Sequence, residues 1–317
     1  MTTTQTRSAS APTHDGPAAA IQLDALTKSF GSVQAVRGID LTVRRGEVVA
    51  ILGPNGAGKT TTIDMVLGLA QPTSGAVSVF GLPPREAIRR GLVAAVMQSG
   101  GLLGDLTVRE TVAYVAELFP RSRPVEEVMT IADIAGIGAR LVKKCSGGEQ
   151  QRLRYAMALV SDPELVILDE PTTGMDVASR RAFWEHIHAD AGTGRTIVFA
   201  THYLEEADAW ADRVVLVREG QVVADGTPAE VKASATGRTV RCTWPGVAEA
   251  DVHSLSSIDG VDGVDVRGAT VMVQTRQSDQ LARHLLTQTS AHDVEITAHG
   301  LEDAFVALTC ATTPEEN

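Results

Sequence analysis

A glycine-rich segment between an apolar run and a helix-forming run constrains this chain more than any other feature. Glu47–Leu52 (EVVAIL) has the character of a buried strand, and TTIDMVLGLA after the glycines favours a helix. Between them, Gly53–Thr60 (GPNGAGKT) fits the pattern GxxxxGK[ST]. Glycines let backbone N–H groups curl around an anion, and the helix start adds unpaired donors. The segment therefore predicts a phosphate-binding loop; the alternative is a glycine-rich turn whose lysine only meets solvent.

The loop pattern assigns chemistry to its last residues. Lys59 would place a positive charge on the β- and γ-phosphates, and the Thr60 hydroxyl would be a Mg²⁺ ligand. The expected nucleotide-binding residues are the loop and the threonine after it: Gly53, Pro54, Asn55, Gly56, Ala57, Gly58, Lys59, Thr60 and Thr61.

Two acids follow a second apolar strand. Leu165–Leu168 (LVIL) is apolar, and Asp169 and Glu170 come directly after it. Ligands gather at the carboxyl ends of parallel strands. Asp169 is therefore expected to hold Mg²⁺, directly or through water, and Glu170 to orient and polarise the water that attacks the γ-phosphate. The alternative, that these acids only solvate a strand end, loses weight beside the loop at Lys59.

Composition excludes several classes of protein. The 317 residues carry a net charge of -11, which argues against a protein that mainly binds the phosphates of nucleic acids. No run approaches the length of about 20 apolar residues that crosses a bilayer, and no early apolar segment suggests secretion. The three cysteines share no CxxC spacing, so neither a zinc site nor a disulfide framework is indicated.

The chain divides by composition into two folded parts with polar ends. Apolar runs alternate with amphipathic stretches up to about residue 232, which is typical of an α/β domain with a parallel sheet. The part that follows is acidic, with 12 acids and 4 arginines from residue 239 on, in the expected order strand, helix, two strands, helix, strand, helix. The expected boundaries are a disordered lead at 1–20, a nucleotide-binding domain at 21–232, a linker at 233–238, a small α+β domain at 239–311 and a tail at 312–317.

The sequence resembles the ATP-binding cassette (ABC) ATPases, because further motifs of that family follow the loop in the same order along the chain. Cys145–Arg152 (CSGGEQQR) is similar to the family signature, and Pro171–Asp176 (PTTGMD) to its D-loop region. The resemblance covers about residues 21–232. It implies an α/β cassette with a parallel core sheet, an antiparallel β subdomain and a helical subdomain, and it implies ATP and Mg²⁺ as cofactors.

The resemblance also implies roles for single residues. Phe30 stands where the family stacks an aromatic on adenine, Gln98 where it has the Q-loop glutamine that reaches the metal, and His202 where it has the switch histidine. Each has another interpretation: Phe30 as a core residue, Gln98 as a polar loop opener, and His202 as a structural or surface histidine.

In the family, two cassettes meet head to tail, and each signature closes over the γ-phosphate held by its partner. Ser146, Gly147, Gly148 and Glu149 are thus expected to contact a partner's ATP, with Asp176 in the D-loop. One cassette per chain then implies a dimer, most simply a homodimer. Cys145, Glu149 and Met175 depart from the usual Leu, Gln and Leu. Cys145 at a helix start is either a somewhat acidified thiol or a packed small hydrophobe.

The resemblance further implies transport through a separately encoded membrane permease, with this chain peripheral on the cytoplasmic side of the membrane. The expected coupling surface lies between Gln98 and Cys145, on a helix with an apolar face: Leu106, Val108, Val112, Val115 and Leu118. The ending HGLEDAFVALT, with Leu301, Phe305 and Leu308 on one face, resembles the daunorubicin-resistance-type subfamily, whose members mostly export drugs, lipids or glycoconjugates.

Two other classes compete with this interpretation. A soluble ABC ATPase of ribosomes or DNA usually has two cassettes and basic linkers, or long coiled coils between the loop and the acids; here 109 residues without heptads separate Lys59 from Asp169. A P-loop kinase of small molecules would leave CSGGEQQR and His202 unexplained.

Overall fold

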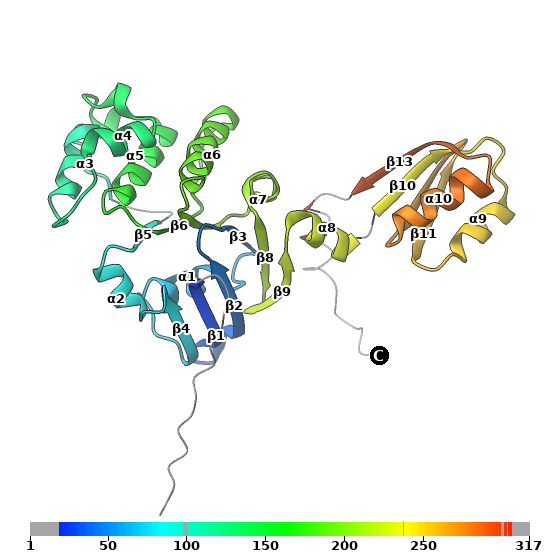
Figure 1. Ribbon diagram of the computed structural model, residues 1–317, viewed down its shortest axis with the longest axis horizontal. Helices are drawn as coiled ribbons and strands as arrows, with labels where there is room; N and C mark the ends of the chain where they lie inside the picture. The colour runs from blue at the N-terminus through cyan, green and yellow to red at the C-terminus, as the bar shows by residue number, and fades with distance from the viewer. Residues whose placement is uncertain (1–18, 98–100, 237, 299–300, 303, 306–317) are drawn as a thin grey trace, which may run out of the picture.

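The computed structural model describes residues 19–97, 101–236, 238–298, 301–302 and 304–305. Within these residues the strands form three separate sheets (Figure 1). None of the helices described is long and apolar enough to cross a membrane.

The largest sheet has six strands in the order β5-β6-β7-β3-β8-β9, parallel except for β9 at one edge. Its strands are β3 (Val48–Leu52), β5 (Val93–Val96), β6 (Leu165–Asp169), β7 (Thr196–Ala200), β8 (Arg213–Arg218) and β9 (Gln221–Gly226). Every residue of β3, β6 and β7 is buried, which agrees with the apolar runs in the sequence.

Alternate residues of these strands enter two different hydrophobic cores. In β3, Ala50 and Leu52 pack into a core that contains Trp184 and Phe183, whereas Val49 and Ile51 pack into the other core. A strand alternates its side chains between the two faces of its sheet, so a sheet covered on both faces needs apolar residues at every position. The helices next to this sheet are α1 (Lys59–Val66), α5 (Gly147–Leu159), α6 (Val177–Ala191), α7 (Leu204–Trp210) and α8 (Pro228–Thr236).

The second sheet is antiparallel, in the order β2-β1-β4, and covers one face of the central sheet. It consists of β1 (Ala19–Phe30), β2 (Val33–Arg44) and β4 (Ser74–Val79), with α2 (Pro84–Arg89) following it. The chain turns at Gly46 (φ 75°), which separates β2 from β3.

Three helices pack together in the core that contains Trp184, in the upper left of Figure 1: α3 (Val108–Ala116), α4 (Val125–Ile131) and α5. Short 3₁₀ turns lie at Ala135–Ile137 and Val142–Lys144. Here the expected coupling face is wrong in part. Val108 and Val112 are fully buried in the core, while Leu118 is 66% exposed. An apolar stripe at helical spacing is the same in the sequence whether it faces the core or a partner.

The third sheet lies beyond α8, in the order β11-β12-β10-β13, and is fully antiparallel. Its elements follow the expected order: β10 (Arg238–Thr243), α9 (Glu249–Ser256), β11 (Val261–Arg267), β12 (Thr270–Thr275), α10 (Ser278–Gln288) and β13 (His292–Ala298). This is the split βαβ arrangement. Residues 233–236, expected in a linker, instead belong to α8, and residue 238 begins β10.

Candidate functional site

The glycine-rich segment forms the turn between β3 and α1, and backbone geometry explains its glycines. Gly56 and Gly58 have φ angles of 80° and 100°, in the left-handed region that side chains disfavour. A Cβ on Gly58 would lie 2.4 Å from the carbonyl oxygen of Ala35, and one on Gly53 would lie 2.2 Å from that of Val217. The loop therefore packs tightly against neighbouring backbone on its outer side.

Lys59 begins α1 and its ammonium group is held by the loop. Nζ donates to the carbonyl oxygens of Gly53 at 2.6 Å and Pro54 at 3.1 Å. Burial lowers the pKa of Lys59, and the negative charges of Glu170 and Asp169 act in the opposite direction. The cationic lysine thus interacts electrostatically with the two acids at the end of the strand Leu165–Asp169, β6.

Asp169 is the last residue of β6, and Glu170 begins the turn after it. Burial raises the pKa of Asp169, and the charge of Glu170 raises it further, while Lys59 opposes the shift. Glu170 has a left-handed backbone with φ 50°, and its N–H donates to the carbonyl of Ala200 at 2.9 Å. Its Oε2 lies 2.6 Å from Nδ1 of His202, which stands just beyond the end of β7. Two neighbouring parallel strands therefore bring Glu170 and His202 into contact.

A cavity of about 550 Å³ opens beside these residues. It is lined by the loop and the first turn of α1, by both acids and by the ends of β1 and β2: Phe30, Val33, Gln34, Ala35, Arg37, Asn55, Gly56, Ala57, Gly58, Lys59, Thr60, Thr61, Asp169, Glu170 and Glu219. Phe30 is 55% exposed at its edge, and Lys28 Nζ lies 5.0 Å from the ring centroid. Phe30 is thus not a core residue, and its ring is free to stack on a planar ligand.

Part of this cavity wall has no motif in the sequence that indicates it. Arg37 of β2 and Glu219 of the β8–β9 turn form an ion pair of 3.8 Å at the rim. Glu219 and Gly220 make that turn, with φ angles of 48° and 78°. The turn signal was present in the sequence, but nothing local indicated that the turn would meet the phosphate loop, where Gly220 N donates to the carbonyl of Ala57 at 2.9 Å.

This site offers hydroxyl and carboxylate oxygens, which are ligands that Mg²⁺ prefers. Thr60 and Asp169 both line the cavity and offer hard oxygen ligands. Among the residues described, no group of three or more His, Cys, Asp or Glu side chains could hold a metal ion alone. A cation here would therefore depend on few protein ligands and on the oxygens of a bound phosphate chain. Gln98, the third expected metal ligand, lies outside the described residues.

The signature residues do not line this cavity. Ser146 caps α5 in a capping box: its Oγ accepts from Glu149 N at 3.2 Å, and Glu149 Oε2 accepts from Ser146 N at 2.8 Å. Gly147 and Gly148 form the first turn of that helix. Asp176 caps α6, with Oδ1 accepting from Ser179 N at 2.9 Å. Cys145 is buried, and burial raises the pKa of its thiol, so the packed hydrophobe is the correct interpretation of this residue.

The fold and the cavity define a P-loop nucleotide-binding protein. Comparison with known proteins narrows this class. The model of the family "ABC transporter" matches residues 36–173. The "Nod factor export ATP-binding protein I" of Neorhizobium galegae is 36% identical over 303 residues, which cover 93% of this chain and 86% of that protein. The protein of the same name from Paraburkholderia xenovorans is 34% identical, with 92% of this chain and 98% of that protein covered.

Solved structures agree with this result. A component of an ABC transporter complex from Clostridium perfringens has a TM-score of 0.62 and 26% identity, covering 75% of this chain and 94% of that one. A dimeric bacterial ABC transporter cassette has a TM-score of 0.59 and 25% identity, covering 65% and 98%. The chain belongs to the ATP-binding cassette (ABC) transporter family, and its activity is that of an ATPase.

Proposed function

We propose that this chain is the ATP-hydrolysing subunit of an exporter, peripheral on the cytoplasmic face of the membrane, where it drives a separately encoded permease. The observation that carries the proposal is the contact of Glu170 with His202 at the edge of the cavity formed by the loop of Lys59. The similarity to export ATP-binding proteins supports the direction of transport, since it extends over 93% of the chain and is not confined to the cassette.

In this proposal the chain's own groups divide the work of hydrolysis. Phe30 stacks on the base, the loop amides and Lys59 hold the phosphates, and Glu170 orients and polarises the attacking water. His202 contacts the γ-phosphate and steadies Glu170. Thr60, Asp169 and Gln98 would hold Mg²⁺, which would supply further positive charge to the phosphate oxygens.

Two cassettes complete the site. Ser146, Gly147, Gly148 and Glu149 do not line the cavity of their own chain. The N–H groups of Gly147 and Gly148 lie in the first turn of α5, at the positive end of the helix dipole, which suits an anion. We infer that they close over the ATP of a second copy, with Asp176 near the contact, so that ATP closes the dimer and hydrolysis opens it. The dimeric cassette among the similar structures supports this arrangement.

The permease would dock on the exposed side of the helical region. Its exposed apolar side chains are Leu103 (59%), Tyr114 (59%), Leu118 (66%) and Phe119 (36%), in place of the buried valines of α3. A basic groove that includes Arg89, Arg90 and Arg121 continues this surface beside Phe119. Apolar side chains flanked by arginines suit an amphipathic helix with acidic flanks.

The transported substrate belongs to the drugs, lipids or glycoconjugates of the daunorubicin-resistance-type subfamily, as the LEDAF ending suggests. The relatives reported above are named for Nod factor export and not for drug efflux.

The test is to purify the tagged chain from its native membranes with ATP and Mg²⁺ and to identify what accompanies it by mass spectrometry. The proposal predicts a multi-span membrane protein in near-equal amount, lost in a Tyr114→Glu/Leu118→Glu variant. It predicts no loss with Leu286→Glu, which alters a residue that is 57% exposed in α10. Recovery with ribosomal or DNA-associated partners would refute the transport role and leave the ATPase in place.

A further inference from the structure

Glu206 is a buried carboxylate that none of the roles above uses. It lies in α7, four residues after His202, and only 3% of it is exposed. A buried carboxylate is costly unless hydrogen bonds and a positive charge compensate it. Its partners therefore indicate why the fold tolerates it.

Both carboxylate oxygens accept hydrogen bonds from fully buried threonines. Thr172 Oγ1 donates to Oε1, and Thr201 Oγ1 donates to Oε2 at 3.1 Å. Thr172 is two residues after Glu170, and Thr201 is the residue directly before His202. One side chain thus joins the turn that carries Glu170 to the turn that carries His202.

Each threonine in turn fixes backbone of its own turn. Thr201 Oγ1 accepts from Tyr203 N at 3.0 Å, so it spans the residue between them, His202. The carbonyl of Thr172 accepts from Met175 N at 3.0 Å, which closes the turn after Glu170. The turn that carries the left-handed Glu170 and the turn that carries His202 are thus each closed by a hydrogen bond of a threonine that Glu206 holds.

Arg180 of α6 supplies the compensating charge. Its Nε lies 3.4 Å from Glu206 Oε1, and its guanidinium carbon lies 3.9 Å from the centre of the Tyr203 ring. That ring lies 4.1 Å from the imidazole of His202. Burial raises the pKa of Glu206, while the hydrogen bonds from the threonines and the charge of Arg180 act against this rise.

We propose that Glu206 is a positioning residue for hydrolysis: by holding Thr172 and Thr201, it sets Glu170 and His202 at their contact distance. The inference rests on the catalytic roles proposed above for those two residues. Glu206 itself does not touch the cavity. Its loss should therefore slow the chemical step and leave the binding of ATP at the Lys59 loop intact.

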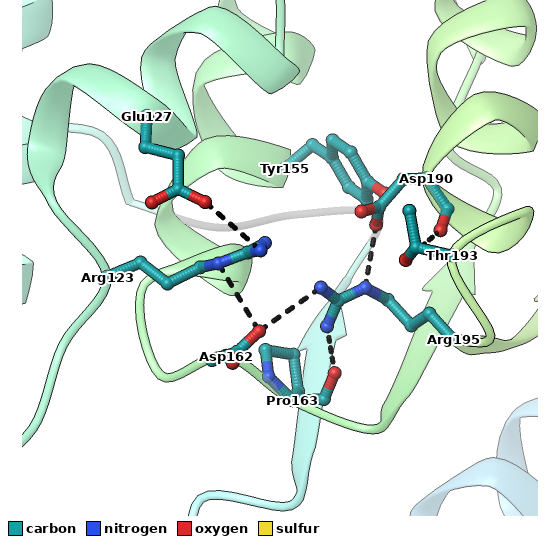
Figure 2. Close-up of polar contacts among 8 residues, drawn as sticks. All are labelled: Arg123, Glu127, Tyr155, Asp162, Pro163, Asp190, Thr193 and Arg195. Atoms are coloured by element: carbon teal, nitrogen blue, oxygen red, sulfur yellow. Dashed lines mark hydrogen bonds and ion pairs between the residues drawn. The ribbon is translucent and has the colours of Figure 1, made fainter.

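The test compares Glu206→Ala and Glu206→Gln with Asp190→Ala. Asp190 is a matched control, because it is also a buried carboxylate, 5% exposed, held by a tyrosine and an arginine. Figure 2 shows it bonded to Arg195 at 2.7 Å, in a network that continues to Asp162 and Arg123 and includes neither Glu170 nor His202. Removing either carboxylate should lower the thermal midpoint.

Phosphate release at saturating ATP, affinity for a fluorescent ATP analogue and thermal unfolding are measured on each variant. Glu206→Ala should lower kcat by roughly 10²-fold, the cost of a misplaced catalytic group, with nucleotide affinity within about twofold of wild type. Glu206→Gln, which can still hydrogen-bond both hydroxyls, should recover part of kcat. Asp190→Ala should keep kcat within about twofold.

Three outcomes would overturn the inference: a wild-type kcat for Glu206→Ala, equal losses of kcat in Glu206→Ala and Asp190→Ala, or a loss of nucleotide affinity without a loss of kcat. Where Glu206→Ala does not fold, Thr201→Val keeps the shape of the side chain, removes both hydrogen bonds of the hydroxyl, to Glu206 and from Tyr203 N, and must lower kcat by itself. A Glu170→Gln variant that hydrolyses ATP normally would instead refute the catalytic roles, so the two failures are distinguishable.

Discussion

Glu170 has a strained backbone, and its carboxylate has a proposed role in hydrolysis. A left-handed backbone costs a non-glycine residue about 1–2 kcal/mol, and Glu170 adopts it with φ 50° while its carboxylate touches His202. The sequence predicts two acids after a buried strand and a histidine after the next. It does not predict the strain or the contact, because both depend on how β6 and β7, which α6 separates along the chain, pair in the sheet.

Glu170→Gln tests the chemistry at this residue. The amide keeps the shape of the side chain but cannot take a proton from water, so phosphate release should fall by about 10²–10⁴-fold. Nucleotide affinity should stay within a few-fold of wild type, since Lys59 and the loop are unchanged. Single-turnover hydrolysis and equilibrium binding measure the two quantities; equal losses in both would contradict the assigned role.

Glu149 makes the stability of the signature helix, α5, depend on pH in the acid range. Burial raises the pKa of this carboxyl, but the hydrogen bonds from Ser146 and the charge of Arg140, 2.7 Å away, outweigh burial and lower it. A lowered pKa stabilises the fold above the ordinary glutamate pKa of about 4.3, and this stabilisation is lost as the pH falls through the lower folded value.

In the Glu149→Gln variant, the thermal midpoint should therefore fall less steeply as the pH is lowered into the acid range. Glutamine can accept the same capping bond, so helix α5 should keep its start at neutral pH. The variant and the wild type should converge as the pH falls below about 4. A difference that grows towards acid pH would show that Glu149 has no lowered pKa in the folded state.

At the scale of elements, the sequence predicts the strands that are buried on both faces and the loop between β3 and α1. Apolar runs and the glycine pattern indicate these elements, and both are local in the sequence. Helices α1 and α5 also begin within two residues of the helix starts that the sequence predicts. Helices α2 and α4 were not expected; both begin after prolines and are too short for a clear apolar period. The inward face of α3 was taken for a docking surface because only tertiary packing decides which way such a stripe points.

Gly58→Ala tests whether the shape of the phosphate loop depends on its glycine. The new Cβ would lie 2.4 Å from the Ala35 carbonyl at a φ of 100°, so the loop must move away from β2. Nucleotide affinity should fall at least about tenfold, equivalent to about 1.4 kcal/mol. Gly268→Ala, also left-handed but with open space around its Cβ, should bind ATP normally. Normal binding by Gly58→Ala would contradict the described loop.

At the scale of the whole molecule, the segment after the third sheet packs on the cassette through Leu301 and Phe305. Leu301 is 4% exposed and packs in the same core as Trp184, with Phe305 against it. Leu301 and Glu302 also line a cavity with His202 and Tyr203. The sequence predicts the apolar face of this last helix. It cannot predict that the face packs on the cassette, because that contact joins distant parts of the chain; Leu308 lies outside the described residues.

Leu301→Ala should therefore destabilise the cassette, although Leu301 lies far along the chain from it. Truncation of a buried leucine costs about 2–5 kcal/mol. Urea unfolding followed by the tryptophans should show this loss, whereas Leu286→Ala at an exposed site should change stability by less than about 0.5 kcal/mol. Equal effects of the two substitutions would mean that the chain end does not pack on the cassette.

The most direct test of the central claim, that two chains share each ATP site, is the mass of the Glu170→Gln variant in solution. We expect light scattering with ATP and Mg²⁺ to give about twice the chain mass of 33.4 kDa, and the single mass without nucleotide. Adding Ser146→Arg, which alters the signature but not the cavity, should return the single mass while ATP stays bound. A monomer with ATP bound in the Glu170→Gln variant would contradict the account.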